Sequence, residues 1–369
     1  MAACTKSQVV YEDSDQEIGL SPVNYTATKA DFYGPVESTV YPHDEEFNIF
    51  ALYTEAPSGT EFSKSGSYTS SMYLSNATFT ARDNIVWGGV TPYYWPKTGS
   101  LYFTGYSPAT APQTADSELP SYIFNPGSNE AKLTFPNFLQ GAYSYTDGTS
   151  TPSEDNYTMV DFMYFDVAPF TTSVNYSTGS GSGYPVTFKH ALSWLTFKFG
   201  VDRDQINGLF TITKVTLKQV KSCATFTSGA GDIYPRPAWS GHDEANDIVL
   251  YDNTKHNSNG SNVLTYADGA KFTIDDILII PQAIYGYGEN NNYTLEVQYT
   301  QRAAAGEAAV QQIPATFKLS GGNGEGENDS EWLINKHYTY NITFTADNEI
   351  LIAPSVDEWD DVNKGAIEL

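Results

Sequence analysis

The clearest hydrophobic pattern of the chain lies near its end, where apolar and polar residues alternate at every second position. Tyr338, Tyr340, Ile342 and Phe344 alternate with threonine and asparagine. Successive side chains of a strand point to opposite faces, so this pattern predicts a β-strand with one face in a core. We expect it to be a permanent core strand.

A second apolar segment follows a polar turn and ends in an acidic tail. It is interrupted by Pro354, which cannot donate a hydrogen bond to a neighbouring strand. A terminal strand of this kind either closes its own sheet or is given to another chain. The residues of this donor-strand candidate are Ile350, Ile352, Val356 and Trp359.

Short apolar segments separated by Gly, Pro and Ser fill the first half of the chain. Residues 47–53 predict a buried strand, and residues 57–75, rich in Ser, Gly and Thr, predict a loop. Residues 93–108 predict a hairpin that turns at residues 96–100.

A small, polar and Gly-rich segment at residues 171–183 predicts a linker between two halves. Each half carries several short strands with Gly and Pro turns, and we find no extended helical spacing. The predicted fold class is therefore all-β, with two tandem β-sandwich domains. We place them at residues 18–175 and residues 184–369, after a flexible tether at residues 1–17.

The first candidate strand follows the acidic tether. Its apolar residues are Ile18, Leu20, Val23 and Tyr25. Pro22 cannot donate to a strand ladder, so this strand is expected to lie at a sheet edge or to be bent.

Charge narrows the possible partners. The chain has 19 Lys and Arg against 44 Asp and Glu, a formal net charge of −25. Binding of nucleic acid needs clustered cations, and an anionic membrane face repels such a surface. Neither partner is expected. Aromatic residues make up 14 % of the chain, which suits half-buried β surfaces.

Candidate chemistry is sparse, and we expect no catalytic residue, no metal and no cofactor. His190 and His337 stand at strand starts, where a structural hydrogen bond is the expected role. Residues 242–244 (His-Asp-Glu) are expected in a polar loop and lack the spacing of a helical zinc site. Two acidic clusters, Asp275-Asp276 and Asp357-Glu358 with Asp360-Asp361, are expected to be surface charge because they lack EF-hand spacing, and binding of Ca²⁺ is the alternative.

The two cysteines, Cys4 and Cys223, allow at most one disulfide. Residues 2–4 (Ala-Ala-Cys) match the pattern of small residues and cysteine at which bacterial lipoproteins are cleaved and acylated. The alternative for Cys4 is an ordinary cysteine near a terminus.

Several motifs in this order resemble those of the fimbrillins, the Mfa-like pilus subunits of anaerobic Gram-negative bacteria. The resemblance covers nearly the whole chain. Its pieces are Ala3-Cys4, Tyr94-Trp95-Pro96, Leu101-Tyr102-Phe103, Phe188-Lys189-His190-Ala191-Leu192, Leu278-Ile279-Ile280-Pro281-Gln282, Lys336-His337-Tyr338-Thr339-Tyr340 and Val356-Asp357-Glu358-Trp359.

The resemblance implies sandwich domains of transthyretin-like Greek-key topology and export as a lipoprotein acylated at Cys4. It also implies an outer-membrane anchor through this lipid before processing, and head-to-tail assembly with other fimbrial subunits at the cell surface. In the family a protease removes the N-terminal strand, and a segment of a neighbouring subunit fills the vacated groove.

Processing in the family usually follows an arginine. The first arginine here is Arg82, deep in the first domain, and Lys29 stands at the expected place instead. Lys29 is therefore our candidate processing site, and an ordinary exposed lysine is the alternative.

A second hypothesis is a surface lipoprotein or tip adhesin that binds a glycan or another host or bacterial surface ligand without polymerising. Tyr93, Tyr94, Trp95 and Trp239 would suit stacking on sugars, although core packing also explains them. An enzyme is the least favoured class.

Overall fold

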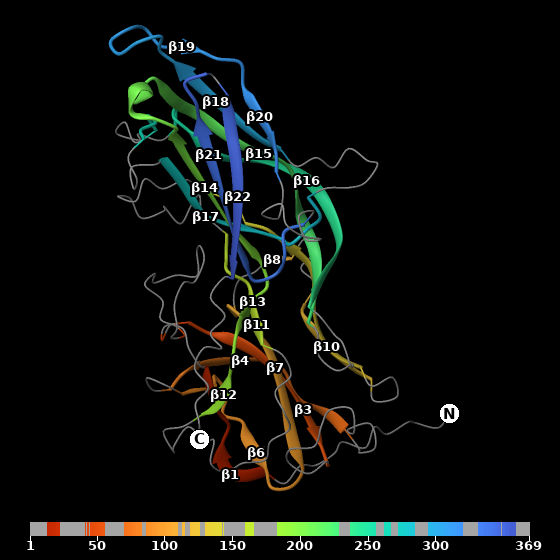
Figure 1. Ribbon diagram of the computed structural model, residues 1–369. Helices are drawn as coiled ribbons and strands as arrows, with labels where there is room; N and C mark the ends of the chain where they lie inside the picture. Colours follow the sequence, from red (N-terminus) through yellow and green to blue (C-terminus); the bar gives the residue numbers. More distant parts are fainter. Residues whose placement is uncertain are drawn as a thin grey trace.

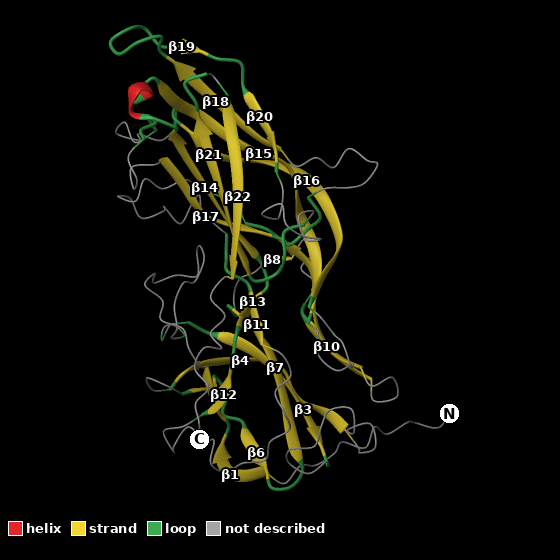
Figure 2. Ribbon diagram, viewed as in Figure 1, coloured by secondary structure: helices red, strands yellow, loops and turns green. Residues whose placement is uncertain are grey.

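The computed structural model describes residues 13–22, 41, 43, 45–55, 70–82, 86–109, 113–114, 119–125, 130–141, 143, 159–165, 183–228, 237–255, 262–266, 272–284, 294–319, 331–347 and 349–358. Nearly all of the regular structure in these residues is β-strand (Figure 2), and the one helical element among them is a 3-10 turn, η2 (Asp204–Ile206). The all-β fold class is confirmed.

An eight-stranded sheet forms the lower half of the molecule in Figure 1. Its strands, in spatial order, are β12 (Tyr184–Val186), β2 (Gly19–Pro22), β5 (Trp87–Gly89), β4 (Ser70–Ala81), β3 (Phe47–Thr54), β7 (Ser100–Ser107), β11 (Met163–Phe165) and β13 (Lys189–His190). Every residue of β3 is buried because its alternate side chains face two cores. Ile49 and Ala51 lie in the smaller core, whereas Phe50 and Leu52 lie in the larger one.

A second eight-stranded sheet extends along the molecule. Its main path is β19 (Val310–Gln311), β18 (Thr294–Gln301), β15 (Phe210–Thr227), β10 (Glu130–Leu139) and β8 (Gln113–Thr114), with β16 (Ala238–Asp252) on β15, β20 (Ala315–Lys318) on β18 and β9 (Ser121–Asn125) on β10. The long strand β15 joins the two ends of this sheet. Its first part pairs with β18 and its last part pairs with β10.

A four-stranded sheet faces the larger core. Its order is β17 (Phe272–Ile279), β14 (Ser193–Val201), β21 (Lys336–Phe344) and β22 (Ile350–Glu358). The alternating residues Tyr338, Tyr340, Ile342 and Phe344 are all buried in that core. The predicted core strand is thus confirmed, and β22 is the outermost strand beside it.

A two-stranded sheet of β1 (Asp13–Glu17) and β6 (Tyr94–Pro96) corrects two expectations. Residues 13–17 were expected to be flexible tether, but they pair with β6. The predicted hairpin is also wrong, because β6 pairs with β1 whereas β7 pairs with β3 and β11. In addition, β4 begins at Ser70, inside the segment predicted as loop.

Strands from both sides of the predicted domain boundary share sheets. β12 and β13 join the first sheet, and β10 pairs with β15 in the second. The residues of the predicted linker lie outside the described residues except for Gly183. The domain limits and the transthyretin-like Greek-key topology stay predictions.

Candidate functional site

The N-terminal strand β2 lies in a slot between two strands from distant parts of the chain. Leu20 pairs with Trp87 of β5 in antiparallel register and with Tyr184 of β12 in parallel register. The prediction of an edge strand is therefore wrong. Pro22 is the last described residue of the strand and lies opposite Val186 of β12.

The side chains of this strand are anchored deeply. Ile18 and Leu20 are both 0 % exposed and belong to the smaller core. The backbone N–H of Ile18 also donates to the carbonyl oxygen of Tyr93 over 2.7 Å. Full burial of each aliphatic side chain contributes about 1.5–3 kcal/mol. Two such residues make the strand a firmly held insert.

Gly183 allows the backbone to approach β2 closely, whereas Gly88 leaves room for the side chains of Arg82 and Glu17. A Cβ atom at Gly183 would lie 2.4 Å from the carbonyl carbon of Leu20, and one at Gly88 would lie 2.8 Å from Nε of Arg82. Gly88 pairs directly with Gly19 of the inserted strand. Any larger residue at Gly183 would push the strand out of its place.

An ion pair closes the outer end of the slot. Glu17 Oε1 lies 3.5 Å from a guanidinium nitrogen of Arg82, which also donates to the carbonyl oxygen of Gly89. The two side chains are 24 % and 34 % exposed. A pair this accessible stabilises by only about 0–1 kcal/mol, so the apolar residues hold the strand.

The C-terminal strand β22 is attached differently. Among the described strands it pairs with β21 alone, from Ile350 opposite Phe344 to Glu358 opposite Lys336. Ile350 and Ile352 pack half-buried against the larger core, whereas Leu351 between them is 55 % exposed. No other described strand pairs with the second edge of β22.

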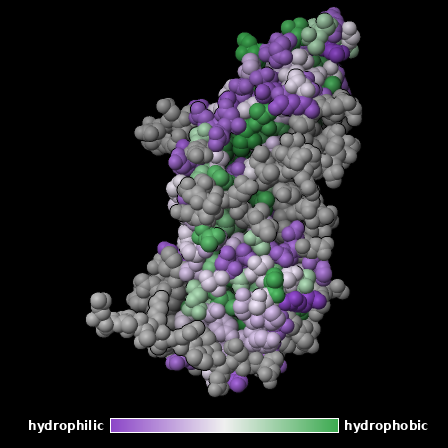
Figure 3. All heavy atoms as spheres, turned by 180° about the vertical axis from the view of Figure 1, so that it is seen from behind, coloured by the Kyte–Doolittle hydropathy of each residue, from purple (hydrophilic) through white to green (hydrophobic). Residues whose placement is uncertain are grey.

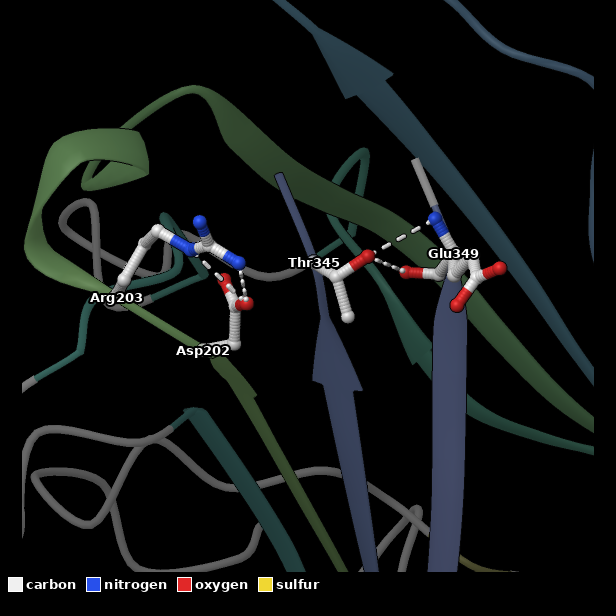
Figure 4. A network of polar contacts seen from close by, with 4 residues as sticks. All are labelled: Asp202, Arg203, Thr345 and Glu349. Atoms are coloured by element: carbon white, nitrogen blue, oxygen red, sulfur yellow. Dashed lines mark hydrogen bonds and ion pairs between the residues drawn. The ribbon is translucent and has the colours of Figure 1, made fainter. Parts of the chain in front are cut away.

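A tight turn connects β21 to β22 (Figure 4). The hydroxyl of Thr345 donates to the carbonyl oxygen of Glu349 over 3.1 Å and accepts from its N–H over 3.0 Å. Beside it, Arg203 donates to a carboxylate oxygen of Asp202 over 2.8 Å. This bond, the charge of Arg203 and the amide of Ala346 lower the pKa of Asp202.

Some of the predicted site residues lie in the described part of the chain and the others do not. Ile18 and Leu20 are in the N-terminal insert, and Ile350 and Ile352 are in the C-terminal strand. The backbone of Val356 pairs opposite Tyr338. The residues outside the described part are Cys4, Val23, Tyr25, Lys29 and Trp359. The two candidate strands belong to different sheets, so a single subunit does not bring them together.

Two histidines have the structural role expected of them. His190 is buried and bonded through Nδ1 to Asp161, at 2.9 Å from Oδ2, a partner that the sequence did not indicate. His337 lies 2.8 Å from the hydroxyl of Thr196 and stacks on Trp194 with ring centroids 3.7 Å apart.

Two other polar predictions need correction. His242 stands in strand β16, not in a loop, with Nε2 at 2.8 Å from the carbonyl oxygen of Pro281. Asp275 is not merely surface charge, because its carboxylate accepts hydrogen bonds from Trp194 and Thr196. In the described residues no group of three or more acidic, His or Cys side chains could hold a metal ion.

The aromatic residues offered for sugar stacking are mostly part of the cores. Trp95 is 1 % exposed, and Trp239 packs against the larger core while its indole N–H donates to the carbonyl oxygen of Ala191. Tyr94 alone is substantially exposed, at 39 %. Within the described part of the chain, no helix is long and apolar enough to cross a membrane.

The fold and the inserted N-terminal strand define an all-β protein whose first sheet is completed by its own terminus. The chain matches the family model described as fimbrillin-like over residues 36–359, and it belongs to that family. This membership gives it a fimbrial or adhesive role and favours a cell-surface location and a non-enzymatic function.

One of the similar known structures supports the same fold. A fimbrial protein from Bacteroides vulgatus matches at 15 % identity with a TM-score of 0.50, over 94 % of this chain and 100 % of that one. A candidate cell adhesion protein from Bacteroides uniformis matches at 14 % identity with a TM-score of 0.48, over 94 % and 99 %. The tip fimbrial protein Mfa3 from Porphyromonas gingivalis, with a C-terminal truncation, matches at 10 % identity with a TM-score of 0.41, over 93 % and 100 %. The search of curated proteins finds no match.

Proposed function

We propose that the protein is a structural subunit of cell-surface fimbriae that joins other subunits head to tail by strand exchange. Cleavage after Lys29 removes β1 and β2, and an extended segment of the next subunit enters the slot. Before that step a lipid on Cys4 holds the subunit at the outer membrane.

The observation that carries this proposal is the slot around Leu20. Removing β2 would leave β5 and β12 with unpaired edges and would uncover the apolar space filled by Ile18 and Leu20. Unpaired backbone groups and empty apolar sites are both satisfied by an added strand. A replacement strand that buries roughly 1,000 Å² would be released very slowly.

The C-terminal strand β22 is our candidate for the donor. It has one neighbour, so leaving its own sheet breaks a single ladder. Its apolar residues Ile350 and Ile352 are two positions apart, which is also the spacing of Ile18 and Leu20. A strand with this spacing can direct both side chains into the same face of a vacated slot.

The proposal is tested by processing the full chain with a lysine-specific protease and examining unboiled samples on a denaturing gel. We expect cleavage at Lys29 and a ladder of SDS-resistant oligomers, because the exchanged strand unbinds slowly. A Lys29→Gln variant is the matched control, and it should remain monomeric after the same treatment.

Two results would count against the proposal. Cleavage at Lys29 that leaves only monomers would exclude assembly by strand exchange. A ladder of equal strength from the Lys29→Gln variant would show that this residue is not the processing site.

A further inference from the structure

An apolar hairpin projects from the end of the molecule opposite β1 and β6 (Figure 1). It connects β18 to β20 and includes β19. Val310 is 60 % exposed and Ile313 is 89 % exposed, and five alanines precede them in residues 303–309. Apolar atoms are also visible at this end from behind (Figure 3). A contiguous exposed apolar surface is a candidate binding site.

The hairpin has a defined backbone. The N–H of Arg302 donates to the carbonyl oxygen of Leu209 over 2.8 Å, and that of Gln312 donates to Tyr299 over 3.0 Å. At the tip, the N–H of Glu307 donates to Ala304 over 3.1 Å. The exposed apolar residues are therefore presented on a fixed support, which lowers the entropy cost of docking.

The opposite end of the molecule carries a second exposed apolar patch, beside the slot for the N-terminal strand. Val90 is 59 % exposed and follows β5, whose Trp87 pairs with Leu20. Tyr94 is 39 % exposed and pairs with Glu17. Arg82 contacts a neighbour of each residue. It forms an ion pair with Glu17, which lies opposite Tyr94, and it donates to the carbonyl oxygen of Gly89, which precedes Val90.

The turn from which a donated strand would swing out lies at the hairpin end. Phe344, the last residue before that turn, contacts Tyr299 at 5.0 Å between ring centroids, and Tyr299 belongs to the strand that leads into the hairpin. A donated β22 therefore leaves from the hairpin end of one copy and enters the slot beside Val90 and Tyr94 in the next. Strand exchange would bring the two exposed apolar surfaces close together.

Charge supports the same pairing. Glu307 is the only charged residue in residues 303–314, and it forms no ion pair with a described residue. When β1 is removed, Arg82 loses the carboxylate of Glu17. In a chain of net charge −25, most contacts between two copies are repulsive, whereas Glu307 beside Arg82 is attractive.

We propose that the hairpin of residues 302–313 docks on Arg82, Val90 and Tyr94 of the next copy, with Glu307 taking the place of Glu17. This inference rests on the proposed strand exchange and adds a second contact between the two copies, beside the exchanged strand. The two docked surfaces belong to opposite ends of the chain, so the contact repeats head to tail without closing.

Disulfide trapping tests the contact directly. The full-length double variant Val90→Cys, Ile313→Cys is processed, assembled and treated with copper phenanthroline, then separated without reducing agent. We expect dithiothreitol-sensitive cross-links between neighbouring subunits, and the Leu119→Cys, Ile313→Cys control should show at least tenfold fewer. Wild type reports any background from the buried Cys223.

The outcomes separate the two proposals. An SDS-resistant ladder without Val90–Ile313 cross-links overturns the docking contact and leaves strand exchange standing. Absence of a ladder in processed wild type overturns strand exchange, and the docking contact with it.

A charge reversal gives an independent measure. Glu307→Arg should slow ladder formation roughly tenfold at low salt, because it sets two cations against each other. Arg82→Glu in the same chain should restore most of the rate. An unchanged rate in Glu307→Arg, or no recovery in the double variant, would overturn the assignment of Glu307 to Arg82.

Discussion

The strands at the two ends of the chain are held in opposite ways. β2 has a neighbour on each edge, and its residues Ile18 and Leu20 are 0 % exposed. β22 has one neighbour, and its residues Ile350 and Ile352 are only half-buried. Local opening is rare where both edges and the side chains are covered, and it is frequent at an accessible edge.

This difference assigns a different means of release to each end. Under the proposed strand exchange, removal of β2 would need a cut in the chain, because both of its edges and its apolar side chains are covered. Under the same proposal β22 would detach without a cut, because it breaks a ladder on one side only. Under the proposed strand exchange, a subunit would therefore stay closed until it is processed, whereas its donor strand would be available throughout.

The largest expected effect comes from emptying the slot. Leu20→Ala should lower the free energy of unfolding by about 2–5 kcal/mol, since it removes a fully buried side chain. Ile352→Ala should cost roughly half as much or less, because that side chain is partly in water already. Urea unfolding of both variants measures the difference, and equal losses would contradict the unequal anchoring of the two ends.

Crowding the slot should have the next largest effect. Gly183→Ala places a Cβ atom 2.4 Å from the carbonyl carbon of Leu20, and such overpacking costs about 1–3 kcal/mol. Hydrogen exchange should become faster in β2 but not in β22. Ala303→Ser on the exposed hairpin is the control, and it should change neither. Unchanged exchange in β2 would mean that Gly183 does not limit the slot.

The alternation of apolar residues and the burial of single strands could be predicted from the sequence, but the partner of each strand could not. The strand from Tyr338 to Phe344 and the buried strand β3 follow from local patterns, because side-chain period depends only on neighbouring residues. The pairing of β1 with β6 joins residues about 80 positions apart, and no local signal reports it. The hairpin expected at residues 96–100 failed for this reason.

The candidate site shows the same division. Ile18 and Leu20 were found because they are apolar residues beside an acidic tether. Their place between β5 and β12 requires a glycine at position 183, and this requirement is visible only once the strands are packed. The loop predicted around His242 was wrong because that segment pairs with β15 as strand β16, although its composition is polar.

The turn before β22 offers a smaller perturbation that acts on the C-terminal end alone. Thr345→Val keeps the shape of the side chain and removes two hydrogen bonds to Glu349, at about 0.5–1.5 kcal/mol each. Hydrogen exchange in β22 should become faster, while β2 should stay protected. If hydrogen exchange became equally faster in β2, the two strands would open together, and the conclusion that they are released independently would be wrong.

The smallest expected effect is a pH dependence of the same turn. The bond from Arg203, the charge of Arg203 and the amide of Ala346 hold the pKa of Asp202 below 3.8 in the folded chain. A carboxyl whose pKa is lower in the folded chain stabilises the folded state at any pH above its pKa in the unfolded chain. This contribution is lost as the pH falls through the pKa of the folded chain. NMR titration of the Thr345 and Glu349 amides should show a shift centred below pH 3.8 that is absent in Asp202→Asn. An identical titration in wild type and Asp202→Asn would show that ionisation of Asp202 does not affect the turn before β22.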